Sequence, residues 1–301
     1  MTENSLKQPF GDRLSNALKA RKTPLCVGID PHISLMPSLF RATGQAEQIE
    51  KLYDFSYACI KAAQDRVPAV KPQVALFEKF GPEGMRVLQQ IGQDAKESGL
   101  LVIMDAKRGD IGSTSTAYAD AWLGANAPFY ADALTVNPFL GLDTLEPFVH
   151  TAIKNHAGLF ILLRTSNPGS SDLQGLQSEN KPVYQHLASK LAPMIDLHKG
   201  KTGWSSIGVV VGATNPSEAG LLRKQLNSSP FLIPGFGAQG ADASMALSGL
   251  TYDHKEPCYQ GGLINSSRAI TFADNTKNVT THSEFVSAVI HNIHDSIEKL
   301  K

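Results

Sequence analysis

Eight short apolar runs recur along the chain, and a segment with helical periodicity follows each of them. Several of these runs are continuously apolar rather than alternating, which is typical of parallel strands buried on both faces. The predicted strands are Leu25–Ile29, Ala69–Lys71, Leu100–Met104, Ala133–Val136, Leu159–Leu163, Ile207–Val211, Phe231–Ile233 and Leu263–Asn265. The predicted helices are Gln48–Ala63, Glu83–Ser98, Ser115–Gly124, Thr144–Asn155, Val183–His198, Ser217–Gln225, Ala241–Leu247 and Glu284–Leu300. Strict alternation through eight units predicts an α/β protein, and it favours a closed (β/α)8 barrel, the TIM barrel, over an open doubly wound sheet.

The 301 residues show no change of composition that resembles a linker, so we expect a single domain over residues 1–301. Three loop-rich stretches, residues 31–46, 166–181 and 250–260, are interpreted as loop insertions on the barrel. The chain carries 28 Lys and Arg against 28 Asp and Glu, and this balance argues against a general nucleic-acid binder. It leaves room for a local basic pocket that binds one small anion.

Targeting and metal-binding patterns are missing from the sequence. Its start lacks the basic and apolar regions of a secretory signal, and its apolar runs are far shorter than the ~18 residues that span a bilayer. Cys26, Cys59 and Cys258 form no CxxC pair, and the nine histidines show neither HxH nor HxxxH spacing. We therefore expect a cytoplasmic protein with reduced thiols and no membrane partner.

Polar and charged residues follow the predicted strands at their carboxyl ends, where (β/α)8 barrels place their chemistry. These residues are Asp30, Lys71, Asp105, Lys107, Asn137, Ser166, Gly235, Ser267 and Arg268. In extended geometry residues two apart share a face, so Asp105 and Lys107 are expected to project together into the barrel mouth. Burying either charge alone would be costly, so the two are expected to pair. A salt-bridged strand end without chemistry is the alternative interpretation.

The run Asp105-x-Lys107-x-x-Asp110-Ile111-x-x-Thr114 resembles the signature of the orotidine 5'-phosphate decarboxylase family. Four further segments resemble the family's strand-two lysine, its pyrimidine-contacting loop and its two phosphate-binding stretches. They are Val70-Lys71-Pro72-Gln73, Ser166-Asn167-Pro168-Gly169, Pro234-Gly235-Phe236-Gly237-Ala238-Gln239-Gly240 and Ser267-Arg268-Ala269-Ile270. The resemblance extends along nearly the whole chain, and the sequence motifs are similar to those of the longer bacterial (type 2) subfamily.

This resemblance implies a carboxy-lyase that converts orotidine 5'-monophosphate to UMP, the final step of de novo pyrimidine synthesis, without metal or cofactor. It implies an alternating array of Lys71, Asp105, Lys107 and Asp110, in which the Lys107 ammonium stabilises a C6 carbanion and then protonates it. Carboxylates on both sides of this lysine would keep it charged.

The resemblance also implies the substrate contacts. Asp30 is expected to contact a ribose hydroxyl and Ser166 the pyrimidine edge. The phosphate is expected to be bound by Gly235, Gln239, Ser267 and Arg268. Asp110, Ile111 and Thr114 are implied to reach the active site of a partner across a homodimer interface. Ser267 stands where compact members usually have glycine, and the resemblance gives Asn167 no role.

Four alternatives remain open at this point. A magnesium-dependent sugar-phosphate decarboxylase on the same barrel can share Asp-x-Lys-x-x-Asp. A Schiff-base aldolase would need a neutral lysine, which two flanking carboxylates disfavour. A barrel that binds a nucleotide phosphate without turnover is the non-enzyme alternative. The stretch Gly235–Gly240 also matches GxGxxG, but Asp253 and Glu256 follow it in a loop pattern rather than at the end of a second strand.

Overall fold

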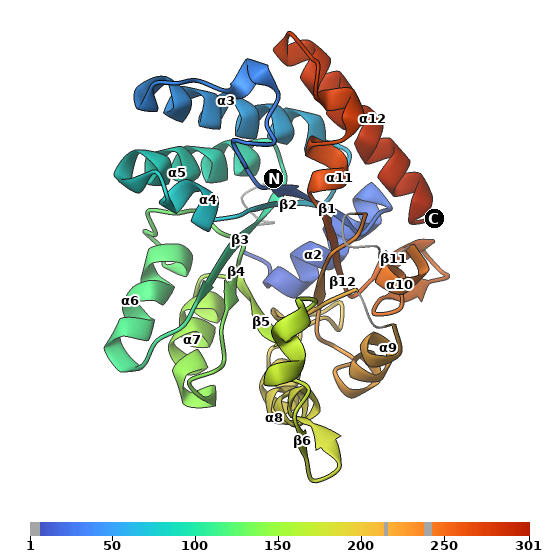
Figure 1. Ribbon diagram of the computed structural model, residues 1–301. Coiled ribbons are helices and arrows are strands. Elements are labelled where there is room, and N and C mark those ends of the chain that lie inside the picture. The colour runs from blue at the N-terminus through green and yellow to red at the C-terminus, as the bar shows by residue number, and fades with distance from the viewer. Residues whose placement is uncertain (1–6, 214–215, 238–242) are drawn as a thin grey trace.

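The computed structural model describes residues 7–213, 216–237 and 243–301, and at its centre eight parallel strands form a closed barrel (Figure 1). In order around the barrel the strands are β1 (Leu25–Ile29), β2 (Ala69–Pro72), β3 (Leu101–Arg108), β4 (Ala133–Val136), β5 (Gly158–Arg164), β8 (Ile207–Val211), β9 (Phe231–Pro234) and β12 (Gly262–Ser266). The barrel closes where β1 pairs with β12, with Leu25 opposite Ile264. The predicted (β/α)8 barrel is therefore confirmed.

Helices follow the strands and cover the outside of the barrel (Figure 1). They are α3 (Gln45–Ala63), α5 (Gly81–Glu97), α6 (Gly112–Leu123), α7 (Glu146–Lys154), α8 (Val183–Leu197), α9 (Pro216–Gln225), α10 (Ala243–Leu247) and α12 (His282–Lys299). Single turns of α-helix occur at α4 (Ala75–Glu78) and α11 (Arg268–Thr271). Turns of 3-10 helix occur at η1 (Ser38–Phe40), η2 (Leu142–Leu145), η3 (Pro168–Asp172) and η4 (Asp274–Thr276). The start predicted for the seventh helix, residues 241–242, lies outside the described residues.

The strands are apolar throughout because they are buried on both faces. Along β1, Cys26 belongs to the apolar cluster inside the barrel, whereas Leu25 and Val27 belong to the larger cluster beneath the helices. The same division separates Leu101 from Val102 on β3. None of the helices among the described residues has the length and apolar character needed to cross a membrane.

An additional helix, α2 (Phe10–Arg21), covers the amino-terminal end of the barrel and was not among the predicted elements. Its Phe10 ring is fully buried and meets Phe160 edge to face, with 5.9 Å between the ring centroids. Gly158 leaves the space for this ring, because a Cβ at that position would lie 2.2 Å from it. With one end covered by α2, access to the interior is left to the carboxyl ends of the strands.

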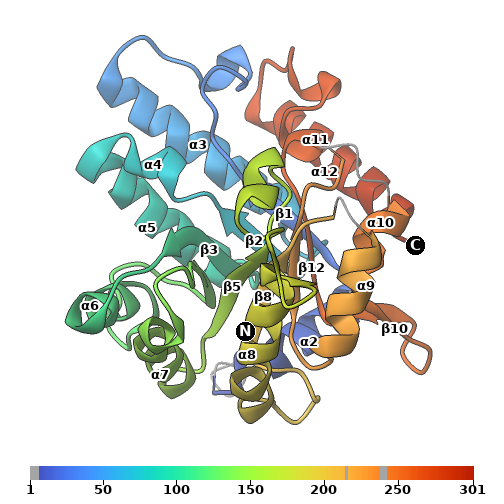
Figure 2. The same ribbon diagram turned by 60° about the horizontal axis from the view of Figure 1, so that its bottom comes forward.

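The loop insertions contain short ordered elements. Residues 166–181 hold η3 and lead into the hairpin of β6 (Gln177–Ser178) and β7 (Lys181–Pro182), which projects beyond α8 (Figure 1). Residues 250–260 form a second hairpin, β10 (Thr251–Asp253) and β11 (Cys258–Gln260), which extends away from the barrel (Figure 2). Residues 31–46 contain only η1 and the first residues of α3.

Strand β3 is longer than the sequence pattern predicts. The prediction ended it at Met104, but pairing with β4 continues to Arg108, opposite Val136, after a break in register between Met104 and Arg108. Asp105 and Lys107 therefore lie within an irregular strand rather than in the loop after it.

Candidate active site

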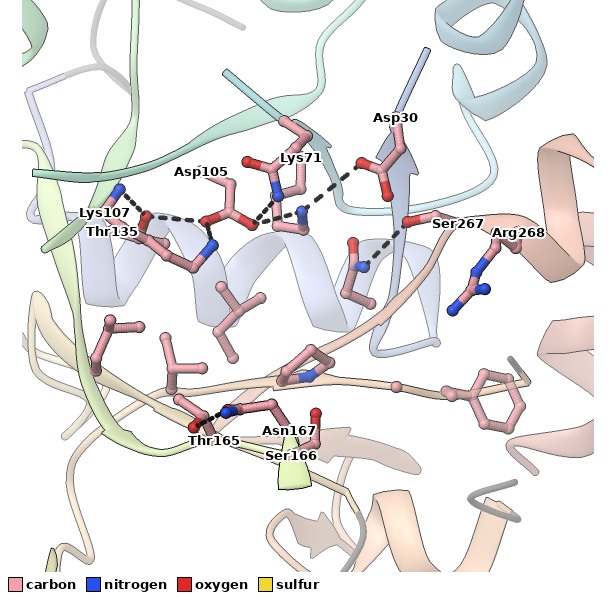
Figure 3. A pocket seen from close by; sticks show the side chains of 18 residues that line it. Asp30, Lys71, Asp105, Lys107, Thr135, Thr165, Ser166, Asn167, Ser267 and Arg268 are labelled. Atoms are coloured by element: carbon pink, nitrogen blue, oxygen red, sulfur yellow. Dashed lines mark hydrogen bonds and ion pairs between the residues drawn. The ribbon is translucent and has the colours of Figure 1, made fainter. Parts of the chain in front are cut away.

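A cavity of about 340 Å³ opens at the carboxyl end of the barrel (Figure 3). Side chains from the ends of all eight strands, or from the loops that follow them, surround it. The lining residues are Asp30, Lys71, Gln73, Asp105, Lys107, Thr135, Leu162, Thr165, Ser166, Asn167, Val210, Leu232, Pro234, Gly235, Phe236, Asn265, Ser267 and Arg268. The structure thus brings together eight of the predicted site residues. They are Asp30, Lys71, Asp105, Lys107, Ser166, Gly235, Ser267 and Arg268.

Two lysines hold the carboxylate of Asp105 between them (Figure 3). Lys71 Nζ lies 2.8 Å from Asp105 Oδ2, and Lys107 Nζ lies 2.5 Å from Asp105 Oδ1. Lys71 Nζ also lies 4.0 Å from Asp30 Oδ1, so this ammonium sits between two carboxylates. The expected pairing of Asp105 with Lys107 is present, and Lys71 extends the array.

Two neutral side chains complete the surroundings of Asp105. Thr135 on β4 donates its hydroxyl to Oδ1 at 3.0 Å, and Gln73 donates its amide to Oδ2 at 3.2 Å. The sequence interpretation missed both residues. A faint signal exists for each, since Thr135 is a polar residue within an apolar strand and Gln73 follows Lys71 by two positions.

The charges of the array stabilise one another against burial. Burial by itself would raise the pKa of Asp105, but the positive charges of Lys71 and Lys107 outweigh it and hold this pKa well below its usual range. Burial would likewise lower the pKa of Lys71, but Asp105 and Asp30 outweigh it and raise this pKa above its usual range. Asp105 is therefore an anion and Lys71 a cation over the whole physiological pH range.

Lys107 combines an unusual backbone with an accessible ammonium. Its φ of +49° lies in the left-handed region, which residues other than glycine seldom adopt. Its backbone N–H donates to Thr135 Oγ1 at 2.9 Å, which stabilises this conformation. The Lys107 side chain is 46% exposed, against 4% for Lys71, so its ammonium can meet a bound molecule. Backbone strain of this kind is concentrated at functional sites.

The opposite end of the cavity is suited to an anion. Arg268 is the first residue of α11, its side chain is exposed, and its guanidinium makes no ion pair with any described residue. Gly235 borders the same region with a φ of +103°. Gly28 lets Ser267 sit close to β1, because a Cβ at Gly28 would lie 1.8 Å from Ser267 Oγ. Gln239, the remaining predicted phosphate contact, lies outside the described residues.

Three predicted site residues do not line this cavity. Asp110 Oδ1 accepts a hydrogen bond from the backbone N–H of Ile111 at 2.8 Å. Ile111 is 62% exposed, and Thr114 is exposed on the first turn of α6. Within one chain, Asp110 is therefore not part of the array of Lys71, Asp105 and Lys107.

The family model and the individual relatives that match this chain indicate the same family. Residues 23–281 match the model of the family described as "Orotidine 5'-phosphate decarboxylase / HUMPS family". The chain is 40% identical to the orotidine 5'-phosphate decarboxylase of Rhodopirellula baltica over 272 residues, which is 88% of each chain. It is 43% identical to the Streptomyces coelicolor protein of the same name over 239 residues, 78% of this chain and 81% of that one.

A solved structure is similar over the same extent. The OMP decarboxylase of Leishmania donovani superimposes with a TM-score of 0.70 at 29% identity, covering 94% of this chain and 99% of that one. The similarity therefore includes the strands that carry the cavity and the loops that surround it.

Proposed function

The chain belongs to the orotidine 5'-phosphate decarboxylase / HUMPS family, and we propose that it decarboxylates orotidine 5'-monophosphate (OMP) to UMP. One observation carries the proposal: Asp105 holds the accessible ammonium of Lys107 at 2.5 Å, at one side of a cavity whose other side offers the Arg268 guanidinium, which has no ion-pair partner among the described residues. A molecule with a reacting carboxylate at one end and a phosphate at the other fits this arrangement of charge.

The reaction needs a positive charge at one carbon atom. When the bond between C6 and the carboxylate carbon breaks, CO2 leaves and the electron pair remains on C6, where no neighbouring group delocalises it. The Lys107 ammonium, already fixed in place, stabilises this carbanion without having to reorganise. The same ammonium then transfers its proton to C6 and forms the C–H bond of UMP. Lys107 is thus both the electrostatic stabiliser and the acid.

Asp105 and Lys71 prepare Lys107 for this role. Asp105 keeps the Lys107 side chain in one position, and Lys71 fixes Asp105 from its other oxygen. Because Asp105 carries a full negative charge, it attracts the Lys107 ammonium and holds it beside the carboxylate. The three residues act as one preorganised unit.

The remaining contacts follow from the cavity. Arg268 provides a bidentate donor for the phosphate, beside Gly235 and Ser267, and we assign Gln239 to the same group from the sequence. We assign Asp30 to a ribose hydroxyl and Ser166 to the pyrimidine edge, and the fact that both residues line the cavity supports this assignment. Binding energy from the distant phosphate can then be used to lower the barrier at C6.

The surroundings of Asp105 favour a reaction without metal over a magnesium-dependent one. Each Asp105 oxygen already accepts two hydrogen bonds, from Lys71 and Gln73 on one side and from Lys107 and Thr135 on the other. A cation bound to Asp105 would have to displace at least one lysine and would face the charge of the second. Among the described residues, no three His, Cys, Asp or Glu side chains are grouped so that they could hold a metal ion.

We further propose that the active unit is a homodimer. Three large apolar side chains are exposed on the segments after β3 and β4: Ile111 at 62%, Phe139 at 71% and Leu140 at 51%. Exposed apolar side chains gathered in one region are typical of protein interfaces. Asp110 and Thr114 lie in the same region, so pairing of two chains would let each supply these residues to its partner's cavity.

The three cysteines are free and buried, which agrees with a cytoplasmic location.

The proposal is tested by adding OMP to the purified chain and measuring UMP and CO2 in the presence of EDTA. We expect stoichiometric formation of both products at a rate that EDTA does not change. Turnover that appears only with added magnesium would favour the sugar-phosphate decarboxylase alternative, and binding of OMP without turnover would favour the non-catalytic one.

A further inference from the structure

Residues 166–181 form an insertion that begins at the wall of the cavity, and one of its side chains reaches back to the barrel. Gln174 Oε1 accepts a hydrogen bond from the backbone N–H of Thr165 at 2.8 Å. Gln174 Nε2 donates to Thr165 Oγ1 at 2.9 Å. One amide side chain therefore binds both the backbone and the hydroxyl of Thr165, directly after β5.

The hydroxyl of Thr165 in turn orients a residue of the cavity wall. Thr165 Oγ1 donates to Asn167 Oδ1 at 2.6 Å (Figure 3). Because the Asn167 carbonyl is turned toward Thr165, the amide NH2 is the group left to meet a ligand. Asn167 lines the cavity, its side chain is exposed, and its Nδ2 makes no hydrogen bond within the described part of the chain.

The insertion is itself tied to the barrel. The backbone N–H of Gln174 donates to Ser170 O at 3.0 Å, and the backbone N–H of Tyr184 donates to Gln174 O at 3.1 Å. Arg164 at the end of β5 donates to Ser170 Oγ at 2.6 Å and to Glu218 Oε2 on α9 at 2.8 Å. Gln174 is thus fixed relative to two neighbouring units of the barrel before it contacts Thr165.

We propose that Asn167 donates a hydrogen bond from its amide to a carbonyl oxygen of the pyrimidine ring, and that Gln174, acting through Thr165, is the residue that positions it. The proposal rests on the proposed function, because it takes the pyrimidine nucleotide as the ligand. Figure 3 shows Thr165, Ser166 and Asn167 across the cavity from Asp105 and Lys107. A flat ring with carbonyl acceptors can lie between these two walls. The insertion then contributes to recognition of the base.

The test compares a ligand that has the base with one that lacks it. Dissociation constants for UMP and for ribose 5-phosphate are measured by calorimetry for the wild-type chain, Asn167→Ala, Gln174→Ala and the double variant. We expect Asn167→Ala to weaken UMP binding about five- to tenfold, as for loss of one net hydrogen bond, and to leave ribose 5-phosphate unchanged. Gln174→Ala should weaken UMP binding by a smaller factor.

The double variant distinguishes positioning from an independent contribution. If Gln174 acts through Asn167, the double variant should bind UMP no more weakly than Asn167→Ala. Gln177→Ala is the matched control, since the side chain of this exposed glutamine of the same insertion makes, within the described part of the chain, one hydrogen bond, to the neighbouring Gly175 O. It should leave both dissociation constants unchanged.

The outcomes that overturn the proposal are distinct from failure of the proposed function. Equal weakening of UMP and ribose 5-phosphate in Asn167→Ala, or no weakening of either, would refute the contact to the base. If the double variant weakened UMP binding by the product of the two single factors, the positioning role of Gln174 would be refuted. A wild-type chain that binds UMP normally but does not decarboxylate OMP would overturn the proposed function alone.

Discussion

The carboxylate of Asp105 accepts hydrogen bonds from four side chains, and two of the donors are lysines. Both Asp105 and Lys71 are buried, so each depends on the other to offset the cost of leaving water. At the residue scale the site is therefore a coupled unit, in which removal of one charge leaves its partner buried and unpaired. The same coupling keeps the Lys107 ammonium in place.

Replacement of Asp105 by asparagine is expected to reduce stability in a pH-dependent way. The pKa of Asp105 is lowered in the folded chain, so its contribution is present above the unfolded pKa of about 4 and is lost as the pH falls below it. At neutral pH, Asp105→Asn should lower the free energy of unfolding by about 3 kcal/mol, the usual cost of breaking a buried pair. Urea unfolding of both chains at neutral and acidic pH measures the difference.

The difference in the free energy of unfolding between the two chains should become smaller toward acidic pH, because the Asp105 carboxylate takes up a proton in the unfolded wild-type chain while it is still charged in the folded one. A difference of constant size at every pH would mean that the charge of Asp105 does not stabilise the fold. Asp143→Asn serves as a control, because this aspartate is not part of the buried array and no ion pair of its side chain is described.

How far the sequence predicts the site depends on the kind of residue. Charged residues at the end of an apolar strand, such as Asp105 and Lys107, stand out because burial of unpaired charge is costly. Thr135 does not stand out, since its role depends on the register between β3 and β4. The left-handed backbone of Lys107 was also not predicted. The prediction assumed a regular extended strand, whereas the strand is irregular between Met104 and Arg108.

At the scale of elements, α2 sets which end of the barrel is open. Phe10, Leu14 and Leu18 of this helix belong to the interior cluster together with residues from the barrel strands. Asp12 fixes the helix from its other side by accepting hydrogen bonds from the backbone N–H groups of Lys201 at 3.0 Å and Thr202 at 2.7 Å. The helix therefore closes the amino-terminal end and takes no part in the chemistry.

Phe10→Ala tests this structural role. Removal of a fully buried ring leaves a cavity against Gly158 and Phe160, and the free energy of unfolding should fall by about 3–5 kcal/mol. Lys19→Ala on the same helix removes only an exposed ion pair with Glu256 and should change it by less than about 1 kcal/mol. Equal effects of the two substitutions in denaturant titrations would contradict the assigned role of α2.

The eight strands could be predicted because each is a continuous apolar run buried on both faces. The helix α2 and the two hairpins could not be predicted in this way, because whether they form depends on the residues that they pack against. Among the described strands, for example, residues 251–253 and 258–260 pair with each other alone, in a two-stranded sheet. Short elements of this kind leave little periodicity in the sequence.

At the scale of the whole molecule, closure of the barrel turns distant positions into one site. Residues from Asp30 to Arg268 meet at one end because all eight strands are parallel and point the same way. A chain with no net charge thereby gains a cavity with separated charges, the array of Lys71, Asp105 and Lys107 at one side and Arg268 at the other. The balance of charge over the chain therefore says little about its site.

The proposed homodimer predicts that two inactive variants can restore one another. Lys107→Ala and Asp110→Ala should each lack activity, because one loses the acid and the other the carboxylate supplied to the partner. In a mixed dimer one site contains both defects and the other contains neither. An equal mixture, allowed to exchange subunits, should recover about a quarter of the wild-type rate by the two-fold symmetry of the pair. No recovery after confirmed exchange would place Asp110 outside the partner's site.

The decarboxylation rate of Lys107→Ala at saturating OMP shows whether the Lys107 ammonium stabilises and protonates C6. Because this side chain is nearly half exposed, the variant should fold and still bind UMP. We predict a fall in kcat of at least about 10³-fold relative to the wild-type chain, since both electrostatic stabilisation and proton transfer are lost. A Lys107→Ala variant that decarboxylates OMP at the wild-type rate would show that this ammonium neither stabilises nor protonates C6.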